Sequence, residues 1–194
     1  MSLPTLDAFK TEQAKRYTIL EGSLIDDQAK YISEFLVQHP DVKRIMEIGF
    51  NGGYGSACFL AARSDITVVS LDIGRWDYVK DAKKLIDEYY PGRHTLVIGD
   101  STQTLPKYQI GQGEPFDLVF IDGGHHTPVP QLDIKNSLPL LRPNGFILMD
   151  DYCTMHGSNG VIAAWDECVR DGRVKQVYVT QKDAERGWAL GTKN

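Results

Sequence analysis

The chain has 194 residues, of which 42% are hydrophobic and 24% charged, a profile typical of one soluble globular domain. Lysine and arginine number 21 against 26 aspartates and glutamates, so the net charge of −5 provides no basic surface for nucleic acid. No run approaches the roughly 20 apolar residues that a membrane helix needs, the first residues lack an apolar signal region, and the three cysteines are too few for a disulfide scaffold; we therefore expect a cytoplasmic protein that binds neither nucleic acid nor membranes.

Short apolar and β-branched runs alternate along the chain with longer amphipathic runs. In chain order, the pattern predicts a helix over 27–38, a strand over 44–48, a helix over 54–63, a strand over 67–71, a helix over 77–89, strands over 95–98 and 116–121, a helix over 129–141, a strand over 146–149, a helix over 159–170, and strands over 174–179 and 187–190. Nearly continuous apolar strands that alternate with helices predict a parallel sheet covered on both faces, which is a doubly wound α/β fold.

The last two strands differ from the others in how they are connected. Residues 180–186 (TQKDAER) leave no room for a crossover helix, and a parallel connection needs about a dozen residues or more. We therefore expect a mostly parallel, seven-stranded sheet that ends in an antiparallel hairpin. No linker or repeat divides the chain, so we expect residues 1–194 to form a single domain with a core over 27–194.

A glycine-rich loop follows the first predicted strand. Its sequence, from Glu47, is EIGFNGGYGS, and a helix comes next. Such a loop lets the backbone approach a ligand closely, and the helix offers free N–H groups. About 25 residues further on, the second strand is followed by Asp72, which is placed to bind ribose hydroxyls. A dinucleotide or an adenosyl compound fits this pattern, but Asn51 breaks the dinucleotide fingerprint GxGxxG. Glu47 could orient the loop or meet a cationic amino-acid group.

These motifs resemble those of the class I S-adenosylmethionine-dependent methyltransferases, whose first motif is an acidic residue, any residue and a glycine. The resemblance covers about residues 20–190, including the terminal hairpin. It implies a Rossmann-like fold, S-adenosyl-L-methionine as the cofactor and a turn at Asp100 and Ser101 that contacts adenine. The cofactor-binding residues expected from motif and resemblance together are Glu47, Gly49, Asn51, Gly53, Asp72, Ile73, Asp100, Ser101 and Asp122.

Carboxylates follow the fourth and fifth predicted strands. Asp122 ends the run DLVFID, and Asp150 and Asp151 end FILMDD. Because neighbouring parallel strands end at the same edge of a sheet, the three carboxylates should crowd together, and a cation would relieve their repulsion. Oxygen ligands of this kind select Mg²⁺ or another hard divalent ion. Alternatively, Asp122 meets the methionyl ammonium of the cofactor, and Asp150 or Asp151 caps the next segment.

The acidic pattern resembles the metal-dependent O-methyltransferases, in particular the macrocin-type group. In that group the fourth strand ends in Asp-Gly-x-His and the fifth in two acidic residues. The resemblance implies Asp122, Asp150 and Asp151 as metal ligands and O-methylation of a small-molecule hydroxyl, sugar-like or from a natural product. His125, rather than His126, is the expected base, with Asp122 beside it in the catalytic pair. Catechol-type enzymes carry Asn at the position of Asp151, so the chain departs from that branch.

Two other functions are compatible with the sequence. One is a metal-independent methyltransferase that acts on nitrogen or protein. The other is a module that binds an adenosyl or nucleotide ligand without chemistry. We expect the segment 1–26, including Glu21 and Gly22, to lie over the cofactor and acceptor site, and we expect a homodimer. His39 and His94 are expected on the surface, and His156 is a minor candidate for a catalytic role.

Overall fold

The computed structural model describes residues 5–16, 24–108, 114–154, 158–180 and 186–194. The predictions for Glu21, Gly22 and His156 lie outside these residues. The chain divides into two compact units, Met1–Gly99 and Asp100–Asn194. The expectation of a single domain stays a prediction.

The described residues of the first unit form three parallel strands and four helices. Its elements in chain order are α1 (Leu6–Arg16), α2 (Asp26–Gln38), β1 (Arg44–Ile48), α3 (Tyr54–Ala62), β2 (Thr67–Asp72), α4 (Tyr78–Tyr89) and β3 (His94–Ile98). Strand β2 is the middle strand and pairs with both neighbours. Its register sets Leu71 opposite Ile48, and Asp72 opposite Ile98. The three strands therefore end together, at the edge where the glycine loop begins.

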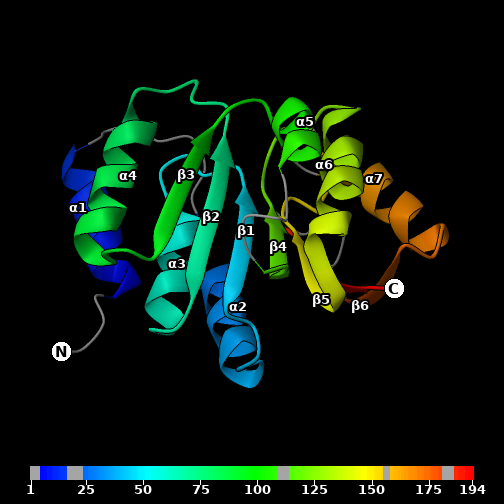
Figure 1. The fold of residues 1–194 in the computed structure, drawn as a ribbon, viewed down its shortest axis with the longest axis horizontal. Coiled ribbons are helices and arrows are strands. Elements are labelled where there is room, and N and C mark those ends of the chain that lie inside the picture. The colour runs from blue at the N-terminus through cyan, green and yellow to red at the C-terminus, as the bar shows by residue number, and fades with distance from the viewer. Residues whose placement is uncertain (1–4, 17–23, 109–113, 155–157, 181–185) are drawn as a thin grey trace. The chain divides into compact units, whose positions relative to one another are not determined.

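Apolar side chains on one face of each helix explain how these helices pack. Helix α4 buries Val79, Ala82, Leu85 and Ile86, which recur every three or four residues as an amphipathic helix requires. Strand β1 is buried on both faces, as the strands of a covered parallel sheet are. Within this unit α2 packs against α3, and α1 lies along α3 and α4 (Figure 1).

The described residues of the second unit form four strands, which pair partly parallel and partly antiparallel. Its elements are α5 (Ser101–Thr104), the 3₁₀ turns η1 (Leu105–Lys107) and η3 (Leu138–Leu140), β4 (Phe116–Ile121), α6 (Val129–Ser137), β5 (Leu141–Met149), α7 (Asn159–Arg170), β6 (Val174–Val179) and β7 (Ala189–Lys193). Strands β4 and β5 are parallel, whereas β7 pairs antiparallel with both β5 and β6. Helix α6 packs against α5 and α7 (Figure 1).

The predicted fold class is confirmed, including the antiparallel pairing of the last two strands. Strands β1, β4 and β6 have the predicted bounds, and the described residues contain seven strands in all. Helices α1 and α5 were not predicted, because α1 has little amphipathic character and α5 is a single turn. Among the described residues, no helix has the length and apolar character needed to cross a bilayer.

Candidate functional site

In the first unit, the glycine loop runs from the end of β1 at Ile48 to the start of α3 at Tyr54. Its backbone has positive φ at Gly49 (95°), Asn51 (48°) and Gly53 (80°). A Cβ on Gly53 would also lie 3.0 Å from Cζ of Phe50. Glycine is therefore required at residue 53 by its backbone angle and by the space available.

The carboxylate of Asp72 ties this loop to the end of β2. Its Oδ2 accepts hydrogen bonds from the backbone N–H groups of Phe50 (3.1 Å) and Asn51 (2.8 Å), and its Oδ1 accepts one from Gly74 (2.7 Å). Asp72 is partly exposed at the predicted ribose position. Its role in ribose binding stays a prediction, but the structure gives it a second task, which is to hold the loop against β2.

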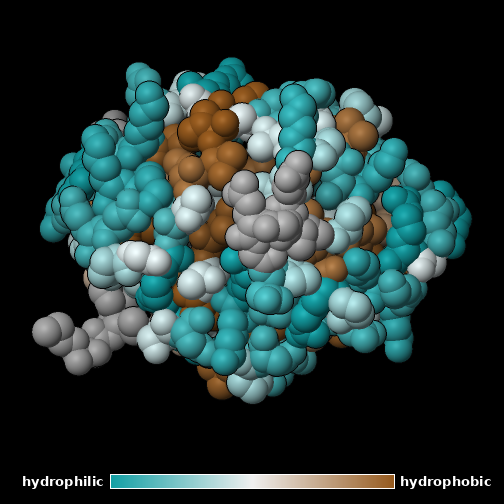
Figure 2. All heavy atoms as spheres, viewed as in Figure 1, coloured by the Kyte–Doolittle hydropathy of each residue, from teal (hydrophilic) through white to brown (hydrophobic). Residues whose placement is uncertain are grey.

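Exposed apolar side chains lie beside the ends of β2 and β3. Ile73 is 64% exposed and Ile98 51% exposed, and a Cβ on Gly74 would lie 2.9 Å from Cγ2 of Ile98. Figure 2 shows apolar atoms gathered in the part of this face where Figure 1 draws the ends of these strands. A flat apolar ligand such as a purine base would cover such a surface, and Ile73 was predicted for that contact.

Glu47 is buried in the first unit instead of facing a ligand. It is 1% exposed, and its Oε2 accepts hydrogen bonds from the hydroxyls of Ser56 and Ser70. Burial raises the pKa of Glu47 to about 7, although the two hydroxyls partly offset the effect. Of the two roles considered for Glu47, this geometry favours the first, orientation of the loop. Direct contact with the cofactor stays a prediction.

The expectation that His94 lies on the surface is wrong. His94 is 7% exposed, and its Nε2 lies 2.9 Å from the Ser70 hydroxyl. Burial lowers the pKa of its imidazole to about 3, so the ring is neutral at physiological pH. The prediction failed because His94 precedes the run that reads as a strand, and sequence periodicity does not show which way a residue at a strand end points.

Helix α1 covers the glycine loop from another side. Gln13, which is fully buried, donates a hydrogen bond from Nε2 to the carbonyl of Gly52 (2.6 Å). The ring of Phe9 would lie 3.3 Å from a Cβ on Gly53 and packs edge-on against Tyr54. No sequence pattern predicted these contacts, because Gln13 lies in a polar, weakly amphipathic stretch.

In the second unit, Asp100 and Ser101 form the turn that starts α5. Asp100 caps the helix, because its Oδ1 accepts hydrogen bonds from the N–H (2.9 Å) and hydroxyl (2.7 Å) of Thr102. Asp133 of α6 is fully buried, and burial raises the pKa of its carboxyl group to about 6, while the nearby Ser101 hydroxyl partly offsets the shift. Adenine contact by Asp100 and Ser101 stays a prediction.

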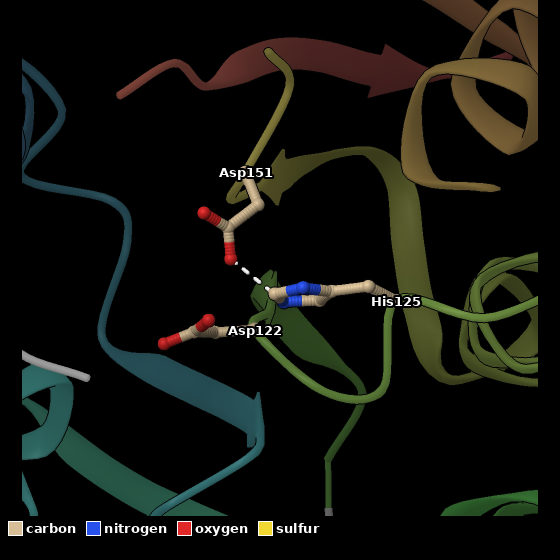
Figure 3. Close-up of side chains that lie close together, drawn as sticks. All are labelled: Asp122, His125 and Asp151. Carbon is tan, nitrogen blue, oxygen red and sulfur yellow. Dashed lines mark ion pairs between the residues drawn. The ribbon is translucent and has the colours of Figure 1, made fainter. Parts of the chain in front are cut away.

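Three side chains of the second unit converge at the ends of β4 and β5. One potential ligand atom from each of Asp122, His125 and Asp151 lies within 4.8 Å of those of the other two. Figure 3 shows the three side chains pointing toward one another, with Nε2 of His125 2.7 Å from Oδ2 of Asp151. This bond is the largest reason that the pKa of His125 is raised.

Local backbone features explain how this group forms. Asp151 has a φ of 55°, in the left-handed region that few non-glycine residues adopt, and it is 4% exposed. A Cβ on Gly160 would lie 2.3 Å from the carbonyl oxygen of His125, so only glycine lets α7 approach the His125 segment so closely. Such constraints typically cluster at functional sites.

Asp150 and His126 do not belong to this group. Oδ1 of Asp150 accepts a hydrogen bond from the backbone N–H of Asp151 (2.8 Å), and His126 is exposed. Of the two adjacent histidines, the structure thus places the favoured one, His125, with the carboxylates. The assignments of Asp150 as a metal ligand and of His125 as a base stay predictions.

Arg186 also lies beside this group, and no sequence motif predicted its position. Its Nη1 is 3.6 Å from Oδ1 of Asp151, on the opposite oxygen from His125. Gly187 makes this approach feasible, because its carbonyl accepts a hydrogen bond from the N–H of Tyr152 and a Cβ there would lie 2.3 Å from the Tyr152 carbonyl oxygen.

The donor set suits a divalent cation. Asp122 and Asp151 supply carboxylate oxygens, which hard cations such as Mg²⁺ prefer, and the imidazole of His125 extends the set to borderline ions such as Zn²⁺ or Fe²⁺. A buried carboxylate such as Asp151 also needs a positive partner. In this structure Arg186 fills that need, and His125 adds to it when its ring is protonated.

Comparisons with known proteins relate the chain to methyltransferases. A family model described as "Methyltransferase domain" matches residues 46–152, more than half of the chain. O-methyltransferase ankF of Aspergillus thermomutatus is 29% identical over 127 residues, which are 63% of this chain and 50% of that protein. O-methyltransferase imqG of Aspergillus flavus is 24% identical over 144 residues, 72% and 57% of the two chains. The chain thus spans about half the length of these curated relatives.

Solved structures share the fold over nearly the whole chain. An O-methyltransferase from Bacillus cereus in complex with SAH has a TM-score of 0.77 at 21% identity and covers 97% of this chain and 90% of its own. The O-methyltransferase TomG from Streptomyces achromogenes in complex with SAM has a TM-score of 0.77 at 20% identity, with 97% and 89% covered. The predicted Rossmann-like fold is confirmed by these likenesses.

Proposed function

The chain belongs to the methyltransferase-domain family, as its sequence motifs predicted, and we propose that it transfers the methyl group of S-adenosyl-L-methionine to a hydroxyl oxygen of a small molecule. The observation that carries the choice of oxygen is the convergence of Asp122, His125 and Asp151. A hydroxyl oxygen must lose its proton as it attacks the sulfonium methyl, and this group contains a base that can take it. The named relatives, two O-methyltransferases, support the same choice.

His125 is the proposed base. The carboxylate of Asp151 holds the imidazole through Nε2 and stabilises its protonated form, which makes the ring a stronger base. With the Nε2 proton directed at Asp151, the other ring nitrogen takes the proton of the acceptor hydroxyl. The methyl group leaves sulfur for oxygen in the same step, so the cofactor becomes S-adenosylhomocysteine.

We further propose a divalent cation, held by Asp122 and Asp151, with Asp150 as an additional predicted ligand. Such an ion lowers the pKa of a bound hydroxyl and orients its oxygen. Support comes from the two carboxylates converging at the ends of β4 and β5. Magnesium suits the oxygen donors.

The cofactor role is assigned to the glycine loop and to Asp72 and Ile73. Backbone N–H groups at the start of α3 would donate hydrogen bonds to the carboxylate of the methionyl group. Asp72 already receives two loop N–H groups, so it links the loop conformation to the ribose position. The exposed side chain of Ile73 supports stacking on the adenine.

A second candidate, a metal-independent methyltransferase, is favoured by one observation. Arg186 lies near Asp151, so the chain supplies a cation of its own at the proposed metal position. In that case Arg186 balances the charge of the Asp151 carboxylate, His125 donates a hydrogen bond to it, and no ion is needed.

Binding and turnover measurements test the proposal. We expect calorimetry to show binding of S-adenosylhomocysteine, and Mn²⁺ as a paramagnetic probe to bind the wild type but not Asp122→Asn or Asp151→Asn. Asp171→Asn, an exposed aspartate of the same unit, is the control. Methyl transfer to a panel of phenolic and sugar hydroxyls should stop with EDTA and return with Mg²⁺. Turnover that survives EDTA and both variants would select the metal-independent candidate, and absence of S-adenosylhomocysteine binding would refute the proposal as a whole.

A further inference from the structure

A buried polar network lies beneath the glycine loop, inside the first unit. Its members come from four elements and are each no more than 7% exposed: Glu47 of β1, Ser56 of α3, Ser70 of β2 and His94 of β3. Polar side chains this deeply buried are costly unless they bond to one another. Because burial of these polar groups is unfavourable, we looked for a role of the network in the glycine loop that lies over it.

The hydrogen bonds within the network have a defined direction. The hydroxyls of Ser56 and Ser70 both donate to Oε2 of Glu47, and the two hydroxyls are 3.0 Å apart. Because Ser70 uses its only proton toward Glu47, its oxygen must accept from Nε2 of His94, 2.9 Å away. His94 is therefore the terminal donor of a chain that runs from β3 through β2 to the end of β1 and the first turn of α3.

A second arm connects His94 to the loop through an aromatic contact. The imidazole is stacked on the ring of Phe50, with centroids 4.9 Å apart and planes inclined by 29°. Phe50 is 2% exposed, and its ring edge lies 3.0 Å from where a Cβ on Gly53 would be. The side chain of His94 thus supports the ring that fixes the left-handed turn of the loop.

The two arms reach opposite ends of the loop. The polar arm ends at Ser56, just after the loop, and the aromatic arm ends at Phe50, near its start. His94 takes part in both arms, and Ser70 links it to the polar arm. Removal of Ser70 would weaken the polar arm and removal of His94 would weaken both, while the strands and their register stay intact.

We propose that His94 and Ser70 are positioning residues that act through Phe50 and Glu47 to hold the glycine loop in its ligand-binding conformation. This inference deepens the proposed function and rests on its assignment of the cofactor to this loop. Neither residue touches the cofactor in this scheme. The arrangement explains why a histidine is buried and neutral at the start of β3.

Loop protection tests the inference without any ligand. In Ser70→Ala, we expect amide hydrogen exchange of the peptide covering residues 49–56 to become about tenfold faster, since the buried hydrogen bond from Ser70 to Glu47 is lost. Exchange in α2 of the same unit should stay unchanged, which separates a local effect from global destabilisation. The matched controls are Thr67→Ala on β2 and Thr95→Ala on β3, both at exposed residues. They should leave the hydrogen exchange of the loop unchanged.

Two substitutions of His94 separate the arms. His94→Phe keeps a ring against Phe50 but loses the bond to Ser70, whereas His94→Gln keeps a donor but loses the ring. We expect each to speed loop exchange by less than Ser70→Ala with His94→Gln combined, which removes both arms. Because the test uses several variants, it can still be carried out if one of them fails to fold.

Affinity for S-adenosylhomocysteine, measured by calorimetry, is the second readout. We expect Ser70→Ala to weaken it about tenfold and the two threonine controls to leave it unchanged. Variants that unfold at lower temperature but keep wild-type loop exchange and wild-type affinity would overturn the inference, because the network would then be only structural. Faster loop exchange in the variants of a protein that does not bind S-adenosylhomocysteine would refute the proposed function and leave the positioning role standing.

Discussion

Substitution of Glu47 by glutamine should change how the stability of the protein depends on pH. Burial raises the pKa of the folded carboxyl group from its ordinary value of 4.5 to about 7. The folded state then binds this proton more tightly than the unfolded state, so the contribution is fully favourable below pH 4.5 and is lost as pH rises to about 7. At about 1.4 kcal/mol for each pKa unit, the loss amounts to about 3 kcal/mol.

Glutamine resembles the protonated glutamic acid in shape and can accept both serine hydroxyls. The free energy of unfolding of Glu47→Gln should therefore exceed that of the wild type by about 3 kcal/mol at pH 8, and by about 1 kcal/mol or less at pH 5. Because burial lowers the pKa of His94 to about 3, that residue has the opposite effect on acid stability. The informative quantity is thus the difference between variant and wild type at each pH.

Urea unfolding followed by circular dichroism at pH 5, 6, 7 and 8 measures this difference. Glu34→Gln, an exposed glutamate of α2 in the same unit, controls for the loss of one negative charge. A difference between Glu47→Gln and the wild type that stays constant over this range would show that Glu47 has the same proton affinity in both states, and the argument from burial would fail.

Three further predictions concern single positions. Gly53→Ala should lower the free energy of unfolding more than Gly92→Ala, since both have positive φ (80° and 73°) but only Gly53 has a crowded Cβ position; chemical denaturation measures the difference, and equal effects would contradict it. Arg186→Met should tighten Mn²⁺ binding, measured by electron paramagnetic resonance, because it removes a cation 3.6 Å from Asp151; unchanged or weaker binding would exclude competition between the two cations. Asp133→Asn should stabilise the protein above pH 6 and not at pH 4, since burial raises the pKa of this carboxyl group to about 6; thermal unfolding at the two pH values tests it, and equal shifts at both would refute it.

The sequence predicted the strands well because each is a short apolar run with clear ends. Strands β1, β4 and β6 have the predicted bounds, while β5 begins five residues earlier than predicted, at Leu141 instead of residue 146. That start contains Arg142, Pro143 and Asn144, which lack the apolar, β-branched character used to recognise strands. Turn-like residues hid the first half of this strand, whereas its pairing with β4 extends back to Leu141.

The sequence also predicted where residues that directly follow strands would lie. It did not predict the contacts of residues from segments that are distant along the chain. Asp122 and Asp151 were predicted to lie together because each ends a strand at one edge of a parallel sheet. Arg186 comes from the segment before β7, and Gln13 reaches the glycine loop from α1. No periodicity or motif encodes these contacts, since they depend on tertiary packing between segments that are distant in sequence.

The charges around Asp151 show why this distinction matters for function. Carboxylates alone suggested that an external cation must neutralise the site, and this was the argument for a metal. The structure supplies one internal cation, Arg186, on one carboxylate oxygen, and the imidazole of His125, which is a cation when protonated, on the other. A divalent ion would have to displace or share these partners, so its affinity is set by the residues that the motif omits. The arginine substitution therefore tests more than one side chain: tighter Mn²⁺ binding would show that Arg186 occupies a position at Asp151 that an ion can take, and unchanged binding would show that the two cations do not compete.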